Sequence, residues 1–296
     1  MTPDQIADRL RLDVVAPMLD PLAVEPDDAA ELRRWLPTLD AADLARVAQT
    51  ADALLGHLGV WTMPDPDLLA AAPDDPGRPP GLLRIAALLA TVPEVRAFHA
   101  ARGIADADSW GALSLFGVQL RIDRAAYDGT FGLRTALWLT APWSGALYWL
   151  GRLQLNLFDL PGEGRWLSAH IPRTGPLTPG DVDASFARAY AFFDLHFPDL
   201  PVRGFHCRSW LLDPQLLEVV APGSNIARFQ QRWLLTDELA PGNADALYFT
   251  FAQRGDLDLG ALPQETSLQR GIVGRIQAGG EWHVRAGTIP RRPPVV

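Results

Sequence analysis

The chain of 296 residues is acidic, with 26 Lys+Arg against 35 Asp+Glu and a formal net charge of -9. All 26 basic residues are arginines, which excludes a catalytic or cofactor-bearing lysine and the lysine of a phosphate-binding P-loop. The negative charge argues against sequence-independent nucleic-acid binding, because that requires a basic face. With 48% hydrophobic residues, the chain can form one large domain or two ordinary ones.

The single cysteine, Cys207, excludes an internal disulfide framework and a cysteine-based zinc site, and it fits a reduced, cytoplasmic setting. Residues 1–17 scatter acids among their apolar positions, so we expect no signal peptide. The richest apolar run, 136–157, is broken by Pro142 and Gly151, and we expect no membrane-spanning segment. The 6 histidines lack the spacing of metal ligands, so we expect no metal.

The first part of the chain has apolar residues at helical spacing. Asp40 is a suitable N-cap for one of these segments, and a loop rich in Pro and Asp follows at 64–80. We therefore predict an all-α N-terminal domain over residues 1–126. Its expected helices span 4–15, 27–36, 40–58, 81–102 and 106–124.

The character of the sequence changes near Tyr127, after which apolar and β-branched segments alternate with turn signals. The order of predicted elements, β-β-β-α-β-α-α-β-α-β, lacks a repeated βαβ unit and makes a doubly wound dinucleotide fold unlikely. We predict an α+β domain over residues 127–296, with a mixed sheet that begins as an antiparallel meander. Its expected strands span 131–140, 146–158, 165–171, 203–210, 246–253 and 281–286.

The loop after the third of these strands leads directly into a helix N-terminus. Residues 172–178 contain Arg173, Thr174 and Gly175, and free amides at a helix start can bind a phosphate group. An ordinary capped helix is the alternative, because Pro179 removes one amide donor and Asp181 already complements the helix dipole. Both interpretations stay open.

His170 lies at the expected end of the third strand, beside this loop. A neutral imidazole there can accept a proton from an attacking amine or hydroxyl near pH 7. The alternative is a histidine that only donates a hydrogen bond to a backbone carbonyl. His170 is the first candidate for a catalytic base.

A second cluster follows on the strand 203–210. Alternation places Cys207 and Ser209 on one face and His206 and Arg208 on the other. Cys207 is a candidate nucleophile, although an adjacent histidine on the opposite face does not reach it, and a buried cysteine is more often a core residue. Ser209 is a candidate proton donor, and Arg208 is a candidate ligand for an anionic group.

A third cluster lies on the predicted helix 225–234. Asn225 can orient a substrate carbonyl or cap the helix, and capping is the favoured interpretation. Arg228 and Arg232 share one helical face, from which they can pair with carboxylates such as Glu218 or bind an anionic ligand.

Several short strings in the sequence resemble a family of bacterial acyltransferase-domain proteins. Members have a helical N-acyltransferase N-terminal domain and a GNAT-like C-terminal domain, and the resemblance covers nearly the whole chain. It is most specific at residues 209–214 and 224–226. The strings are His170-Ile171-Pro172, Ser185-Phe186, Phe192-Phe193, Phe197-Pro198, Cys207 to Pro214, Ser224-Asn225-Ile226, Leu268-Gln269-Arg270, Gly279-Gly280 and Trp282.

The resemblance implies transfer of an acyl group from a CoA thioester to the amine of a small acceptor, by direct attack. It places the donor loop at residues 172–178 and the base at His170, with Ser209 returning a proton to the thiolate. Of the superfamily's usual Arg/Gln-x-x-Gly-x-Gly/Ala loop, this chain keeps only Arg173 and Gly175. Arg208, Asn225 and Arg228 are the further candidates for binding acyl-CoA.

Two other hypotheses remain beside this one. A covalent route would pass through Cys207, and a non-catalytic ligand-binding or scaffold protein would retain the fold without the chemistry. An acyl carrier protein is an alternative donor, but the charge of -9 offers no broad basic surface for an acidic carrier and favours a small acyl-CoA.

Overall fold

The computed structural model describes residues 1–61, 66–72, 74–160, 162–253, 255 and 257–291. Two compact units form the chain, Met1–Trp149 and Leu150–Val296, and each is described by itself. The domain boundary after residue 126 stays a prediction. No helix among the described residues has the length and apolarity to cross a membrane.

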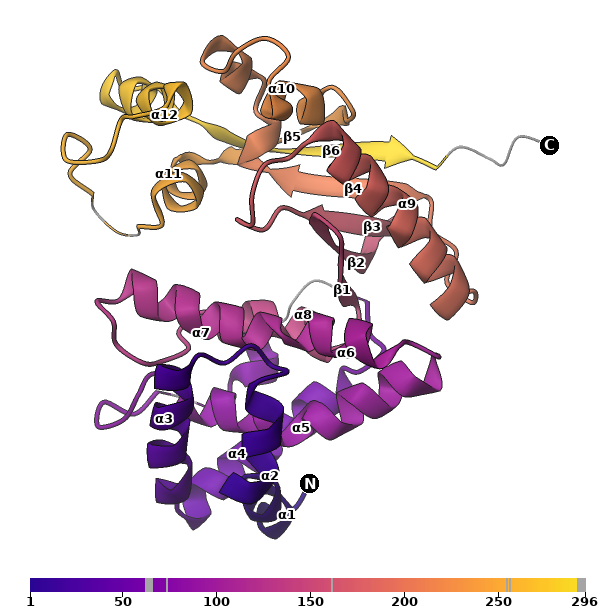
Figure 1. Cartoon of the computed structure of the whole chain (residues 1–296), viewed down its shortest axis with the longest axis vertical. Helices are drawn as coiled ribbons and strands as arrows, with labels where there is room; N and C mark the ends of the chain where they lie inside the picture. The colour runs from indigo at the N-terminus through magenta and orange to yellow at the C-terminus, as the bar shows by residue number, and fades with distance from the viewer. Residues whose placement is uncertain (62–65, 73, 161, 254, 256, 292–296) are drawn as a thin grey trace. The chain divides into compact units, whose positions relative to one another are not determined.

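The first unit is built from helices, as predicted (Figure 1). Asp40 caps the fourth of them, since its carboxylate accepts a hydrogen bond of 2.9 Å from the amide of Asp43. Within the predicted loop at 64–80, Pro66–Leu69 forms a 3-10 turn, and residues 62–65 and 73 lie outside the described residues. The helices are α1 Pro3–Arg9, α2 Leu12–Leu19, α3 Pro26–Trp35, α4 Ala41–Gly56, α5 Leu82–Ala101, α6 Asp106–Leu113 and α7 Leu115–Ala126.

The predicted strand at 131–140 is wrong. This segment contains the 3-10 helix Ala136–Leu139 and leads into the short helix α8, Thr140–Trp143. Leu133, Ala136 and Leu139 recur at every third residue and are all buried in the core of the first unit. That spacing suits a 3-10 helix, and it outweighs the preference of Phe131 and Thr135 for strands.

A six-stranded mixed sheet has the order β1-β2-β3-β4-β6-β5; strands β2 to β6 belong to the second unit, and β1 spans the point of the chain where the first unit ends. β2 and β3 are antiparallel, β3 and β4 are parallel, and β6 is antiparallel to both β4 and β5. The predicted α+β class with an opening meander is thus confirmed. The expected strand 146–158 is two strands separated by a turn at Gly151 and Arg152, and the φ of 85° at Gly151 suits glycine. The strands are β1 Leu147–Leu150, β2 Leu153–Leu160, β3 Gly164–His170, β4 Gly204–Ser209, β5 Leu234–Pro241 and β6 His283–Pro290.

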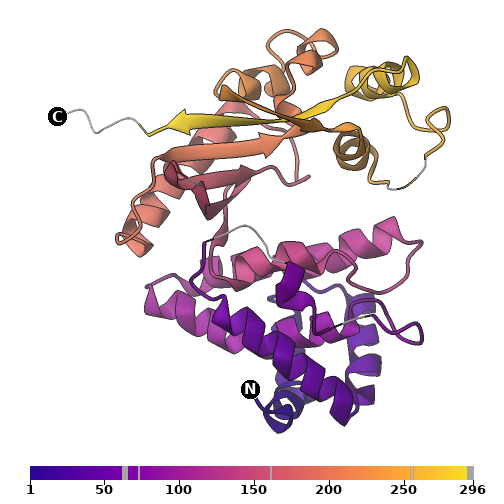
Figure 2. The same ribbon diagram turned by 180° about the vertical axis from the view of Figure 1, so that it is seen from behind.

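The long helix α9, Pro179–His196, packs on one face of this sheet. It lies in front of the strands in Figure 1, and the strands lie in front of it in the reverse view of Figure 2. Phe186 of α9 stacks on Phe205 of β4 with ring centroids 4.2 Å apart. Thr178 caps α9 by accepting from the amide of Asp181, so the predicted helix start is confirmed.

The predictions for residues 231–253 are wrong in two places. The expected helix 225–234 ends at Gln230, as α10 Asn225–Gln230, and β5 follows as a strand that was not predicted. The expected strand 246–253 is helix α11, Asn243–Phe251. Leu247 and Phe251 are four residues apart and pack against the same core cluster, so burial of a helical face outweighs their strand propensity.

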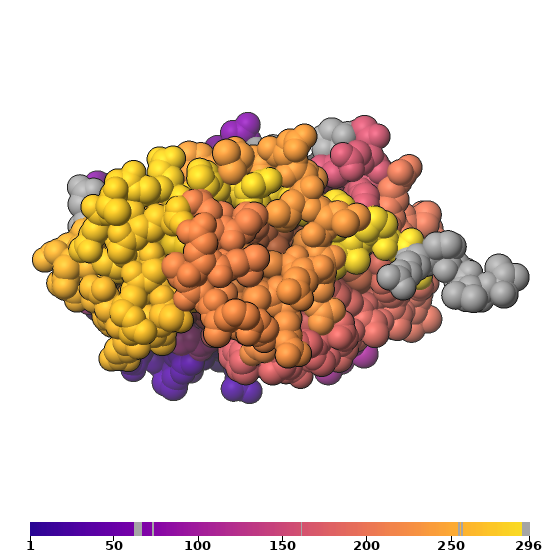
Figure 3. All heavy atoms as spheres, turned by 90° about the horizontal axis from the view of Figure 1, so that it is seen from above, coloured from indigo at the N-terminus to yellow at the C-terminus, as the bar shows by residue number. Residues whose placement is uncertain are grey.

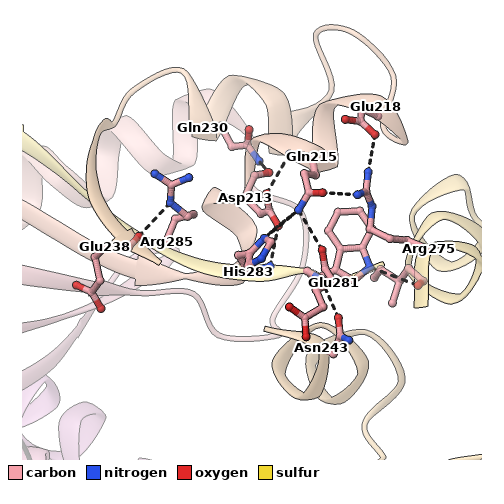
Figure 4. A network of polar contacts seen from close by, with 12 residues as sticks. Asp213, Gln215, Glu218, Gln230, Glu238, Asn243, Arg275, Glu281, His283 and Arg285 are labelled. Atoms are coloured by element: carbon pink, nitrogen blue, oxygen red, sulfur yellow. Dashed lines mark hydrogen bonds and ion pairs between the residues drawn. The ribbon is translucent and has the colours of Figure 1, made fainter. Parts of the chain in front are cut away.

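The segments after β4 are joined by a polar network around the buried side chain of Asp213 (Figure 4). Its carboxylate accepts from the backbone amide of Gln215 at 3.1 Å, from the Gln215 side chain at 2.9 Å and from the amide of His283 at 2.7 Å. Arg275 of α12, Ser267–Gln277, donates to Gln215 and pairs with Glu218. This network connects the 3-10 turn Pro214–Glu218 to α12 and β6.

The surface of the second unit shows the same neighbours from outside. Yellow residues of α12 and β6 lie beside orange residues from the stretch between β4 and β5 (Figure 3).

We predict that Asp213→Ala lowers the unfolding free energy of the protein by about 3 kcal/mol, because it leaves several donors unpaired around a buried site. Chemical denaturation measures the change. Asp237→Ala is the matched control on the exposed strand β5, with an expected change within about 0.5 kcal/mol. Equal stability of the two variants would contradict the role given to the network.

Candidate functional site

The central feature of the second unit is the separation of the parallel strands β3 and β4. Their register contains only the pairs Leu167↔Phe205 and Ser168↔His206. Beyond these pairs, β3 stays paired with β2 as far as His170, and β4 stays paired with β6 as far as Ser209. No further pairs join residues 169–170 to residues 207–209, so backbone groups along these facing edges can bind an extended ligand.

His170 lies at the end of β3, where this opening begins. Its Nε2 is 2.5 Å from Oδ1 of Asn156 on β2. The Asn156 amide group donates from Nδ2 to the carbonyl of Leu157 at 2.7 Å, which fixes the side-chain oxygen toward the histidine. Because that oxygen only accepts, Nε2 carries the proton and Nδ1 is the basic nitrogen of His170.

The surroundings of His170 keep the imidazole neutral. Burial lowers the pKa of His170 from 6.5 to about 4, and the neighbouring His206 lowers it further in the same direction. Burial also lowers the pKa of His206. Both imidazoles are therefore uncharged near pH 7, when His170 can accept a proton at Nδ1.

The loop between His170 and α9 is held by Arg152, which lies with Gly151 in the turn between β1 and β2. The Arg152 guanidinium donates to the carbonyl of Gly175 at 2.7 Å and to that of Pro176 at 3.0 Å. Its backbone amide donates to Oγ of Ser185 on α9 at 2.7 Å. The carbonyl of Pro176 points toward Arg152. The N–H of Leu177 belongs to the same trans peptide and lies opposite this carbonyl, so it points away from Arg152.

The clamp also packs tightly. A Cβ added at Gly151 would lie 2.8 Å from Oγ of Ser185, so only glycine fits this turn against α9. Arg173, Thr174 and Gly175 are exposed on the loop. The contacts of Arg152 with the loop and with Ser185 therefore hold the loop from below and leave its residues Arg173, Thr174 and Gly175 exposed.

Cys207 and Ser209 do not lie as two side chains of one catalytic pair. Cys207 is fully buried on the apolar side of β4, and burial raises the pKa of its thiol to about 12. Such a thiol is protonated at neutral pH, and the structure gives no support to a covalent route through it. Oγ of Ser209 accepts from the amide of Leu211 at 3.1 Å, and its hydroxyl hydrogen can still be donated.

The remaining predicted ligands of an anionic group do not converge on the loop. Arg208 pairs with Glu238 of β5 at 2.5 Å, and Arg228 donates to the carbonyl of Gly223 at 2.9 Å. Asn225 is the first residue of α10, and its neighbour Ser224 provides the cap. Arg232 does reach the start of α9, where it pairs with Asp183 rather than Glu218.

Sequence reasoning missed Arg152 and Asn156. Both residues lie within the apolar run 136–157. A charged or amide side chain that is buried among leucines needs polar partners. The positions of Arg152 and Asn156 between leucines are therefore a signal in the sequence that could have identified them. Among the described residues, no group of three or more His, Cys, Asp or Glu side chains is arranged to hold a metal ion.

Comparisons with known proteins cover both units. A family model described as N-acyltransferase N-terminal domain matches residues 14–145, and one described as GNAT-like C-terminal domain matches residues 147–289. A search of curated proteins found no match.

Solved structures of acyltransferases are similar over almost the whole chain. A mutant acyltransferase in complex with octanoyl-CoA is 34% identical, with a TM-score of 0.83 and coverage of 95% of this chain and 88% of that one. An acyltransferase in complex with decanoyl-CoA and teicoplanin is 33% identical, with a TM-score of 0.82 and coverage of 98% and 100%. Another in complex with decanoyl-CoA is 30% identical, with a TM-score of 0.82 and coverage of 99% and 100%.

We predict that the Cys207 thiol of the native protein does not react with Ellman's reagent at pH 8, because it is buried and its pKa of about 12 keeps it protonated. One equivalent should react after denaturation in guanidinium chloride. Rapid reaction in the native state would contradict this placement and would restore Cys207 as a candidate nucleophile.

Proposed function

The chain belongs to the family of acyltransferases that combine an N-acyltransferase N-terminal domain with a GNAT-like C-terminal domain, and we propose that it transfers an acyl group from acyl-CoA to an amine. The observation that carries the proposal is the separation of β3 and β4 beside His170 and the clamped loop. The octanoyl-CoA and decanoyl-CoA in similar structures support a medium-chain acyl-CoA rather than a carrier protein as the donor.

In the proposed donor site, the pantetheine chain of acyl-CoA lies between the diverging edges 169–170 and 207–209. Unpaired amides there bind the thioester carbonyl and stabilise its developing negative charge. The loop 172–178 and the start of α9 receive the pyrophosphate, with Arg173 and the loop amides as donors. Arg152 positions this loop and does not itself touch the donor.

The proposed reaction is direct attack. The amine nitrogen forms a bond to the thioester carbon, and the C–S bond then breaks to give an amide and CoA thiolate. The proton leaves the nitrogen as its bond to carbon forms and is accepted by Nδ1 of His170. Ser209 is the proposed hydroxyl through which a proton passes from water to the departing thiolate, so Ser209 is itself unchanged, and His170 returns its proton to solvent.

We predict that His170→Ala lowers kcat by about 100-fold or more with octanoyl-CoA and an amine acceptor, because general-base catalysis contributes about 10² to 10⁴. The release of CoA is measured, and binding of octanoyl-CoA by calorimetry should change less than about twofold. His196→Ala is the control, because His196 lies at the C-terminal end of α9 and the loop 172–178 precedes its N-terminal end. Wild-type protein that binds octanoyl-CoA without turnover would favour the non-catalytic hypothesis.

The same measurements give a pH dependence. His170 must be neutral to accept a proton, and it is neutral above its pKa of about 4. The value of kcat/KM, corrected for the fraction of free amine, should therefore stay flat from pH 7 to about pH 5 and fall only near pH 4. A fall of kcat/KM centred near pH 6.5 would indicate a base with the pKa of an ordinary exposed histidine and would contradict this prediction.

We predict that Arg152→Gln weakens binding of octanoyl-CoA by roughly tenfold, because the carbonyls of Gly175 and Pro176 lose charged donors and the loop loses its fixed conformation. Calorimetry measures the change, and the same comparison with desulfo-CoA, which lacks the thiol, and dephospho-CoA, which lacks the 3′-phosphate, locates it. Arg165→Gln is the matched control, since Arg165 pairs with Asp159 at the opposite end of β3. Equal affinities of both variants would contradict the clamp.

A further inference from the structure

Two carboxylates lie in the first turns of α9, at the helix start that receives the pyrophosphate in the proposed donor site. Asp181 is the third residue of the helix and Asp183 is the fifth, and both side chains are exposed. A carboxylate there interacts favourably with the positive end of the helix dipole. It also repels a phosphate group bound at the same place, because the two charges have the same sign. A phosphate site at this helix start therefore requires that both negative charges be offset.

Each of the two carboxylates has an arginine that comes from outside α9. Burial lowers the pKa of Arg152, and the neighbouring charge of Asp181 acts on it in the opposite direction. The carboxylate of Asp181 also accepts a hydrogen bond of 2.5 Å from Oγ1 of Thr178. Arg232, which follows α10, forms an ion pair with Asp183. The second of these arginines has no role in the donor site as described so far.

Arg232 holds the start of α9 through both of its terminal nitrogens. Nη1 pairs with Oδ1 of Asp183, while Nη2 donates to Oδ2 of the same carboxylate and to the carbonyl of Pro179, each at 3.2 Å. Two hydrogen bonds from one guanidinium to one carboxylate fix the geometry of the pair. Both oxygens of the Asp183 carboxylate are therefore bound by Arg232, beside the first residue of the helix.

The backbone that carries Arg232 is anchored in the apolar core of the second unit. The next residue, Trp233, is only 6% exposed, and its ring centroid lies 6.0 Å from that of Phe186 on α9 and 5.6 Å from that of Phe229 on α10. A Cβ added at Gly287 of β6 would lie 3.0 Å from Cβ of Trp233, so the strand passes close to this residue. Arg232 therefore reaches α9 from a fixed position.

The stability of the fold does not explain the pair of Arg232 and Asp183. The side chain of Asp183 is 61% exposed and that of Arg232 is 23% exposed. Water screens an ion pair of this exposure, so it contributes little to the free energy of unfolding. Its effect on the local charge is larger in proportion, because it removes one of the two negative charges from the start of α9.

We propose that Arg232 is a positioning residue for the donor, which neutralises Asp183 so that the start of α9 binds the pyrophosphate of acyl-CoA. The inference rests on the proposed function, because that function places the phosphates of the donor at this helix start. Arg232 does not touch the donor in this arrangement. It acts through Asp183, whose free carboxylate opposes the binding of a phosphate group.

Calorimetry of octanoyl-CoA binding to the full chain tests this role. Arg232→Gln should weaken binding about 3- to 10-fold at an ionic strength of about 0.05 M, because it leaves the charge of Asp183 uncompensated beside the phosphates. The loss should fall below about twofold at roughly 0.5 M salt, which screens exposed charges. Arg232→Lys keeps the positive charge and should bind octanoyl-CoA within about twofold of the wild type.

A second substitution separates the charge of Asp183 from every other effect of Arg232. Asp183→Asn combined with Arg232→Gln removes the repelling charge, so the double variant should bind octanoyl-CoA within about twofold of the wild type. S-octanoyl-pantetheine, which lacks the nucleotide and its phosphates, should bind equally to the wild type and to Arg232→Gln. Arg291→Gln is the matched control and should leave octanoyl-CoA binding unchanged, since Arg291 pairs with Asp194 in the last turn of α9.

The outcomes distinguish this role from the function on which it rests. Unchanged octanoyl-CoA affinity in Arg232→Gln overturns the inference and leaves the acyltransferase function in place. A double variant as weak as Arg232→Gln shows that Arg232 contacts the donor itself, and an equal loss for S-octanoyl-pantetheine shows a structural effect; each overturns the inference alone. A wild-type protein that does not bind octanoyl-CoA overturns the proposed function and the inference together. Thermal unfolding checks that each variant is folded.

Discussion

The second unit depends on the fact that β3 and β4 have different partners on their outer sides. β3 is held by β2 over seven residue pairs, from Gln154↔His170 to Leu160↔Gly164, and β4 is held by β6 over six, from Gly204↔Pro290 to Ser209↔Arg285. Between them, only two pairs hold the parallel strands together. The ladder between them therefore ends before His170, and this places His170, the facing strand edges and the loop to α9 at one position.

The two faces of the sheet then give neighbouring side chains opposite properties. On the apolar face, burial raises the pKa of Cys207 and leaves a neutral thiol within the core. On the opposite face, burial lowers the pKa of His170 and leaves a neutral imidazole, oriented by Asn156. The same physical cause, removal from water, makes the cysteine unreactive and keeps the histidine able to accept a proton.

The sequence predicted most of this architecture, and its errors have physical causes. The meander, the capped helix α9 and the position of His170 follow from local signals such as turns, caps and alternation. The segment 131–140 was misassigned because its burial in the helical unit is a long-range effect. β5 was missed because it is an exposed edge strand with an irregular register between Leu235 and Leu239, so it lacks alternation.

The candidate site was predictable only in part for the same reason. His170 and the loop lie next to each other in the sequence, so their proximity follows from chain order. The clamp of Arg152 on Gly175 spans 23 residues, and the pairing of Arg232 with Asp183 spans 49. Neither can be read from spacing alone, and neither can the pairing of Arg208 with Glu238, which lie 30 residues apart in the sequence.

Hydrogen–deuterium exchange of the full chain with and without octanoyl-CoA tests the central claim most directly, because it reports where the donor contacts the backbone. We predict slower exchange at the amides of residues 169–178 and 207–210, the facing strand edges and the clamped loop, when octanoyl-CoA is bound. Binding confirmed by calorimetry, with unchanged exchange in both segments and protection elsewhere, would contradict the placement of the donor between β3 and β4.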